Sequence, residues 1–129
     1  MKYALVSLLV AACGGDDTNI KMDAAKMDSG SGAMATVVAA DCSGGSQAMV
    51  MEMDGVDAFM PMSTSIGMGQ VVKFVTSTEH NVAPNPIAAK TDPGLSVGFN
   101  TTKCLRFTAT GTFGFMCSVH SFVGTVTVN

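Results

Sequence analysis

Apolar and polar residues alternate with a period of two in several short segments, and this pattern limits the fold more than any other feature. Phe113, Phe115 and Cys117 occupy alternate positions in one segment, and Val126 and Val128 alternate with threonines in a later one. Successive side chains of a strand point to opposite faces of a sheet, so each set lies on one face. The pattern predicts β-strands near the C-terminus.

Three earlier segments have the same character. They are the run from Met49 to Met53 with methionine at every second position, the valine-rich run 71–75, and the run 104–108 with Leu105 and Phe107 on one face. Glycine and proline separate these runs, residues 83–96 hold too many such breakers for regular structure, and residues 110–112 look like a turn. Short strands between glycine-marked turns are typical of an all-β sandwich or barrel.

The composition agrees with a small folded domain and excludes one class of partner. Hydrophobic residues make up 47% and charged residues 13% of the 129 residues, which is enough to bury a core. The formal net charge is only -3, and the lysines and arginines are scattered. Because no basic patch is present, we expect no nucleic-acid partner.

The N-terminus predicts export. Lys2 precedes an apolar run over residues 3–12, about ten residues long, whereas a membrane span needs roughly 20. The sequence Leu-Val-Ala-Ala-Cys at residues 9–13 resembles a bacterial lipoprotein signal, which implies cleavage after residue 12 and a lipid on Cys13. An ordinary signal peptide with a chance cysteine is the alternative. Either way we expect a protein of the bacterial cell envelope or periplasm, attached to a membrane only through that lipid.

The remaining chain divides into a tether and one domain. Residues 13–36 contain no aromatic residue and no clean periodicity, so they cannot bury enough apolar surface to offset the entropy of ordering. We therefore expect a signal peptide over residues 1–12, a flexible tether over residues 13–36 and a single domain over residues 37–129.

One cysteine and both histidines of the chain suggest a metal site. Cys117 and His120 lie three residues apart at the end of a predicted strand, and His80 follows another. Soft thiolate with two imidazoles is the ligand set of electron-transfer copper sites. A buried structural cysteine is one alternative. Zinc normally takes four protein donors in structural sites, and a Cys–His nucleophile would need an orienting third group. The sequence therefore predicts one copper ion bound by His80, Cys117 and His120.

Three segments resemble the cupredoxin family of blue copper proteins. They are residues 59–74, with an aromatic-x-proline stretch before a valine-rich strand, residues 80–82, and residues 113–120 followed by the strand at 124–128. The resemblance covers residues 37–129. It implies a Greek-key β-sandwich or barrel with a single type 1 copper. It further implies a monomeric electron carrier, not an enzyme, that meets redox partner proteins transiently.

The resemblance also implies roles for residues around the metal. Most relatives have an axial methionine after the second histidine, but this chain has Val123, which offers no donor atom. We therefore expect a three-coordinate site with a distant backbone oxygen from Glu79 and a reduction potential above that of a Val123→Met variant. The other expected roles are Asn81 tethering the ligand segments, Phe115 beside the ligands, Phe122 with Val123 as an apolar docking patch, and His120 as the electron exit.

The two other cysteines and the methionines each lead to a further expectation. If Cys13 carries lipid and Cys117 binds metal, Cys42 and Cys104 remain, and disulfides persist in exported proteins. We therefore expect a disulfide between Cys42 and Cys104. The chain also has 11 methionines, which we expect to fill gaps in the core and positions in the tether. Thioethers are soft donors, so the alternative is Cu(I) binding by a module for copper storage, delivery or resistance. A structural or adhesion domain with a vestigial copper loop is a third class.

Overall fold

Nine strands and one short 3-10 helix are present in the computed structural model, which describes residues 34–129. In chain order they are β1 (Val37–Ala40), the 3-10 helix η3 (Cys42–Gly44), β2 (Ala48–Met53), β3 (Val56–Met60), β4 (Ser63–Ile66), β5 (Val71–Val75), β6 (Ala83–Pro84), β7 (Thr102–Phe107), β8 (Gly111–Met116) and β9 (Val123–Val128). No helix of this part of the chain is long and apolar enough to span a membrane. The predicted signal peptide, Cys13 and nearly all of the tether lie outside the described residues.

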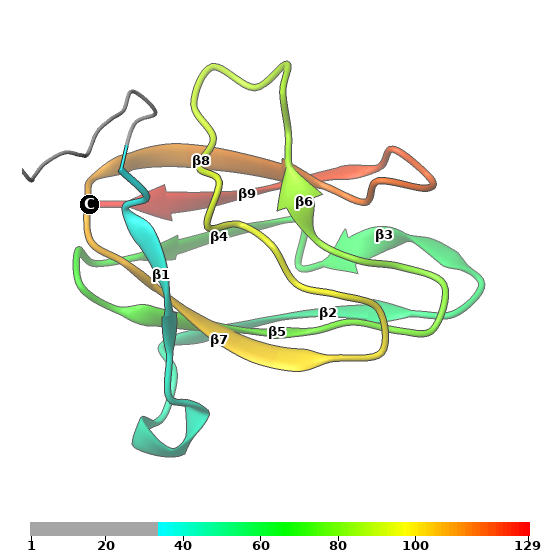
Figure 1. Ribbon diagram of the computed structural model, residues 1–129, viewed down its shortest axis with the longest axis horizontal. Helices are drawn as coiled ribbons and strands as arrows, with labels where there is room; N and C mark the ends of the chain where they lie inside the picture. Colours follow the sequence, from blue (N-terminus) through cyan, green and yellow to red (C-terminus); the bar gives the residue numbers. More distant parts are fainter. Residues whose placement is uncertain (1–33) are drawn as a thin grey trace, which may run out of the picture. The chain divides into compact units, whose positions relative to one another are not determined.

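The strands form two facing sheets (Figure 1). One sheet has the order β1-β7-β5-β2-β3, and the other has the order β4-β9-β8-β6. The pairs β2–β5 and β4–β9 are parallel, and the other pairs are antiparallel. The chain changes sheets between β3 and β4, where the Met60–Pro61 peptide bond is cis. The all-β Greek-key sandwich predicted from the sequence is confirmed.

The core lies between the sheets and follows the predicted alternation. Phe113, Phe115 and Cys117 are all fully buried, as their shared face predicts. The ring of Phe115 makes edge-to-face contacts with Phe59 and Phe74, at centroid distances of 4.7 and 5.4 Å. Burying a large apolar side chain contributes roughly 1.5–3 kcal/mol each, so these rings dominate the stability of the region beneath the C-terminal loop.

Three details of the strand prediction are wrong. The first two residues of the segment 83–96, expected to lack regular structure, form the short strand β6, which pairs with β8. Residues 110–112 are not a turn, because β8 already begins at Gly111, which pairs with Val128. Strands β3 and β4 were not anticipated. Each lies at the edge of its sheet, and in β4 only Ile66 is buried, so neither has a strong apolar alternation.

The methionines do not fill the core as expected. Met49 and Met53 on β2 are 46% and 44% exposed, whereas Val50 and Glu52 between them point inward and are buried. Met60, Met62 and Met68 are also exposed. The alternation therefore separated the two faces of β2 correctly, but the buried face is the one that carries Val50 and Glu52.

The predicted disulfide between Cys42 and Cys104 is confirmed. It joins η3 to strand β7, with a distance of 5.3 Å between the two Cα atoms. Ala40 at the end of β1 pairs directly with Cys104 in the ladder. The disulfide therefore pins the edge strand β1 at its C-terminal end.

Candidate metal centre

Three loops meet at one end of the sandwich, on the right in Figure 1. They are the turn between β2 and β3, the segment 76–82 after β5, and the loop 117–122 between β8 and β9. Hydrogen bonds connect the first loop to the second and the second to the third. The second loop carries His80, and the third carries Cys117 and His120.

Cys117 and His120 share the tight loop between β8 and β9. The loop closes on itself, because Ser121 N–H donates to the Cys117 carbonyl and Cys117 N–H donates to the Phe122 carbonyl, both at 3.0 Å. Ser121 adopts a left-handed backbone with φ 64°. This fold of the loop turns the His120 ring back, so that its Nδ1 lies 4.0 Å from the buried Cys117 Sγ.

His80 comes from the segment after β5 and is almost completely buried, with 1% of its surface exposed. Its ring lies 4.9 Å from the ring of His120 and 4.9 Å from that of Phe122, measured between centroids. Its Nδ1 lies 3.2 Å from Ser77 Oγ. The structure therefore brings the two histidines together, and His120 also approaches Cys117.

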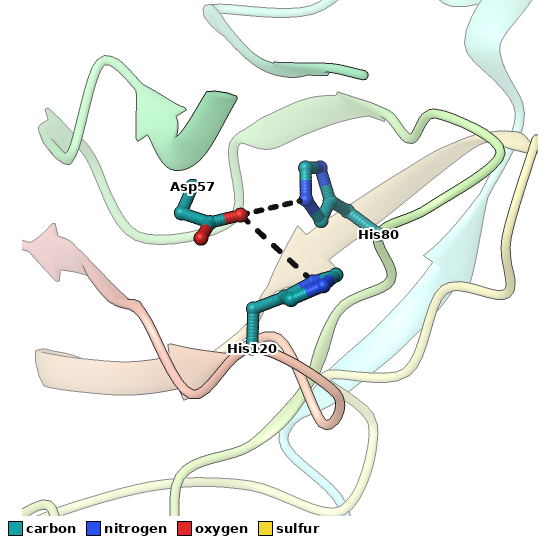
Figure 2. A group of neighbouring side chains, drawn as sticks. All are labelled: Asp57, His80 and His120. Carbon is teal, nitrogen blue, oxygen red and sulfur yellow. Dashed lines mark hydrogen bonds and ion pairs between the residues drawn. The ribbon is translucent and has the colours of Figure 1, made fainter. Parts of the chain in front are cut away.

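Asp57, which is not among the residues predicted from the sequence, lies next to both histidines. Figure 2 shows the side chains of Asp57, His80 and His120 converging, with Asp57 Oδ1 3.3 Å from His80 Nε2 and 3.9 Å from His120 Nδ1. Donor atoms of these three residues all lie within 4.8 Å of one another. A single aspartate in a weakly patterned segment gives no signal by itself.

Neighbouring polar side chains connect the ligand loops. Asn81 Oδ1 accepts hydrogen bonds from the backbone N–H and the hydroxyl of Ser118, at 2.9 and 3.0 Å. Glu79, from which the sequence suggested a distant backbone oxygen, uses its side chain elsewhere: Oε2 accepts from Gly55 N–H at 2.9 Å. Its own N–H donates to Asp54 Oδ1 at 3.1 Å.

The expected apolar patch is only partly at the surface. Phe122 is half-buried, and its ring packs against Phe59 at 4.7 Å as well as against His80. It forms a wall of the site. Val123 is 42% exposed, and Val119, which the sequence analysis did not select, is 58% exposed. The apolar surface around the loop thus comes from two valines.

A buried acid lies near the end of β2. Glu52 is 6% exposed, and neither oxygen of its carboxylate has a hydrogen-bond partner in residues 34–129. Burial raises the pKa of Glu52 from 4.5 to about 7. The Ser77 N–H lies near enough to oppose this shift slightly, without the geometry of a hydrogen bond.

The donor spacing suits a transition-metal ion. The measured separations between neighbouring donor atoms are 3.3, 3.9 and 4.0 Å. Donors bonded at about 2.0–2.3 Å to one tetrahedral ion lie roughly 3.3–3.6 Å apart, and the donor atoms of Asp57, His80 and His120 come close to this spacing. Cys117 Sγ approaches the His120 nitrogen but does not belong to that close group. Thiolate, imidazole and carboxylate are all metal-binding groups. Asp57, His80 and His120 can therefore hold one ion, with Cys117 beside His120.

Comparisons with known proteins agree with the fold. No protein-family model and no curated protein matches the chain. A reduced amicyanin variant is 20% identical with a TM-score of 0.50, covering 67% of this chain and 84% of the amicyanin. Another reduced amicyanin variant is 20% identical with a TM-score of 0.50, covering 63% and 80%. A purple cupredoxin from Nitrosopumilus maritimus is 19% identical with a TM-score of 0.49, covering 64% and 100%. The amicyanin likeness shows that the chain has a cupredoxin-like fold.

Proposed function

We propose that the protein is a single-copper electron carrier of the bacterial cell envelope, with His80, Cys117 and His120 as metal ligands. The observation that carries this proposal is the position of His120, whose Nδ1 lies 4.0 Å from Cys117 Sγ while its ring contacts that of His80. One thiolate with two imidazoles is the ligand set of electron-transfer copper sites. The cupredoxin-like fold supports the same role.

Residues around the three ligands would hold them in position and exclude water. Cys117 and His80 are buried, and Phe122 closes one side of the His80 ring. The hydrogen bonds from Ser118 to Asn81 tie the two ligand loops together. A bound copper ion supplies a one-electron couple between Cu(II) and Cu(I). Fixed ligands suit both oxidation states, because little rearrangement is then needed at each transfer.

The side chain of His120 is 34% exposed and provides the route for electrons. Val119 and Val123 flank it on the surface, at 58% and 42% exposed. A small apolar rim around an exposed ligand suits short-lived contacts with redox partner proteins. The proposal therefore includes transient partners and no catalytic step of the protein's own.

Attachment to the membrane through Cys13 is part of the proposal, on the strength of the N-terminal sequence alone. A Cys13→Ser variant expressed in a bacterial host should lose the lipid mass and move from the membrane fraction to the soluble fraction. Retention of the variant in the membrane would contradict the lipid anchor.

Copper stoichiometry and voltammetry test the electron-carrier function. The protein loaded with Cu(II) should contain one copper per chain and give a reversible one-electron wave. His80→Ala and His120→Ala should lose the wave, whereas Glu79→Gln should retain it. A copper-loaded protein without a reversible wave would contradict the proposal.

One observation favours copper handling as a second candidate. Met51 and Met60 are direct partners in the β2–β3 ladder, so their side chains share the outward face, next to Met49 and Met53. Thioethers are soft Cu(I) donors. This function requires more than one Cu(I) per chain, with the excess lost in the Met51→Leu/Met60→Leu double variant. A single Cu(I) per chain in both proteins would exclude it.

A further inference from the structure

We propose that the carboxylate of Asp57 is a fourth ligand of the metal bound by His80, Cys117 and His120. The inference rests on the proposed copper site and deepens it. It replaces the three-coordinate centre expected from Val123 with a centre of two nitrogens, one sulfur and one oxygen.

The Asp57 oxygen lies close to both histidines. Oδ1 lies 3.3 Å from His80 Nε2 and 3.9 Å from His120 Nδ1 (Figure 2). The same His120 Nδ1 lies 4.0 Å from Cys117 Sγ. The carboxylate is therefore as close to the shared His120 nitrogen as the thiolate is. An ion bound by both histidines would be within reach of Asp57.

The His80 ring is oriented with Nε2 toward Asp57. Metal-binding histidines usually donate their other ring N–H to a nearby oxygen, which fixes the ligating nitrogen. Both ring nitrogens of His80 lie near an oxygen, Nδ1 at 3.2 Å from Ser77 Oγ and Nε2 at 3.3 Å from Asp57 Oδ1. With Nδ1–H donated to the Ser77 hydroxyl, Nε2 is the ligating atom, and Nε2 is the nitrogen that faces Asp57.

Strand β3 directs Asp57 toward the two histidines. Residues two apart in a strand share a face. Asp57 therefore shares a face of β3 with Phe59, which is 2% exposed and belongs to the core. Its side chain is 65% exposed, yet within residues 34–129 its ion-pair contacts are with the two histidines and with no lysine or arginine. No other cation competes for the carboxylate there.

Hydrogen bonds hold the turn before Asp57 against the segment that carries His80. Asp54 accepts hydrogen bonds from the Thr78 hydroxyl at 2.9 Å and from Glu79 N–H at 3.1 Å. Glu79 in return accepts from Gly55 N–H at 2.9 Å. The Thr78 hydrogen bond lowers the pKa of Asp54, so its carboxylate stays ionised. The two hydrogen bonds accepted by Asp54 do not involve the Glu79 side chain, and they fix the spacing between Asp57 and His80.

A carboxylate ligand would reverse the effect expected from Val123. Cu(II) with one thiolate carries a net charge of +1, and a second anionic ligand makes it neutral. Cu(I) with both anions is -1. An added negative charge therefore stabilises the oxidised state relative to the reduced one. The reduction potential should then be lower with Asp57 than without it.

The test compares the full chain with Asp57→Asn, Asp57→Ala and the control Glu79→Gln. The control removes one negative charge from the same end of the sandwich and keeps an oxygen that can accept from Gly55. Each protein is loaded with Cu(II) and examined by visible absorption, electron paramagnetic resonance and potentiometry. Cu(II) affinity is measured by competition with a chelator, and thermal unfolding of the metal-free proteins checks that all are folded.

We expect both Asp57 variants to have a higher reduction potential, an altered copper hyperfine splitting and at least tenfold weaker Cu(II) binding, with Glu79→Gln close to wild type. Asp57 variants that differ from wild type no more than Glu79→Gln does would overturn the inference. A wild-type protein without a thiolate-to-copper band would instead contradict the proposed electron-carrier site. The affinity comparison between Asp57→Ala and Glu79→Gln would still decide the role of Asp57.

Discussion

Asn81 holds Ser118 by two hydrogen bonds, from the backbone N–H at 2.9 Å and from the hydroxyl at 3.0 Å. Asn81 follows His80 in the chain, and Ser118 follows Cys117. The contact therefore joins the two segments whose side chains approach each other at the proposed metal site.

Replacing Asn81 should loosen the metal site. In Asn81→Ala the Ser118 N–H loses its acceptor, so the loop 117–122 gains freedom and copper should bind about 10-fold more weakly. The rate of copper release to a chelator measures this. Asn81→Asp retains the acceptor oxygen and serves as the control. Equal release rates for Asn81→Ala and wild type would show that the contact does not support the site.

The free energy of unfolding of the metal-free protein should fall as the pH rises from about 4.5 to about 7. Burial raises the pKa of Glu52 from 4.5 to about 7, so over this range the folded chain holds a proton that the unfolded chain releases. Each pKa unit corresponds to about 1.4 kcal/mol, and after allowance for solvent screening the fall should be roughly 1–3 kcal/mol.

Denaturant unfolding at pH 5 and pH 8 measures this decline. In Glu52→Gln the decline in stability from pH 5 to pH 8 should be smaller by roughly 1–3 kcal/mol. In Glu79→Gln, which changes an exposed residue, the decline should be the same as in wild type. An identical pH dependence in Glu52→Gln and wild type would refute the assignment to Glu52.

Gly124 should be intolerant of a side chain. A Cβ atom at this position would lie 2.6 Å from the ring of Phe115 and 3.1 Å from that of Phe59. Overpacking a core costs roughly 1–3 kcal/mol, so Gly124→Ala should lower the free energy of unfolding by about that amount. Gly98→Ala, whose nearest contact is 3.6 Å from the added atom, is the matched control. Equal stabilities of the two variants would contradict the packing described here.

Reducing the disulfide should destabilise the fold. The Cys42–Cys104 bond closes a loop of 62 residues, which in the chain-entropy model stabilises the folded state by on the order of 4 kcal/mol. Unfolding in denaturant with and without a thiol reductant measures the difference. The metal-free protein is used, so that Cys117 is free in both cases. A difference below about 1 kcal/mol would show that the pinned edge strand contributes little.

Local patterns predicted the strands with a strong apolar alternation, such as the one carrying Phe113 and Phe115. They could not predict which face of β2 is buried, because alternation separates two faces without choosing between them. Packing brought Val50 inward and Glu52 with it. Edge strands β3 and β4 bury few residues and left a weak pattern.

The same limit applies to the metal site. Cys117 and His120 are three residues apart and share one loop, so their association was visible in the sequence. Asp57 is 23 residues from His80, on an unpredicted strand. Asp57 approaches His80 because hydrogen bonds hold the β2–β3 turn against the segment 77–80. This is a tertiary contact that local sequence patterns do not encode.

The most direct test of the proposed copper site is to compare the visible absorption spectra of the copper-loaded wild type and the copper-loaded Cys117→Ser variant. Direct bonding of the Cys117 thiolate to Cu(II) predicts an intense charge-transfer band in the wild type. The serine variant should lose that band and remain folded. An unchanged band in Cys117→Ser, or a copper-loaded wild type without one, would contradict the proposed site.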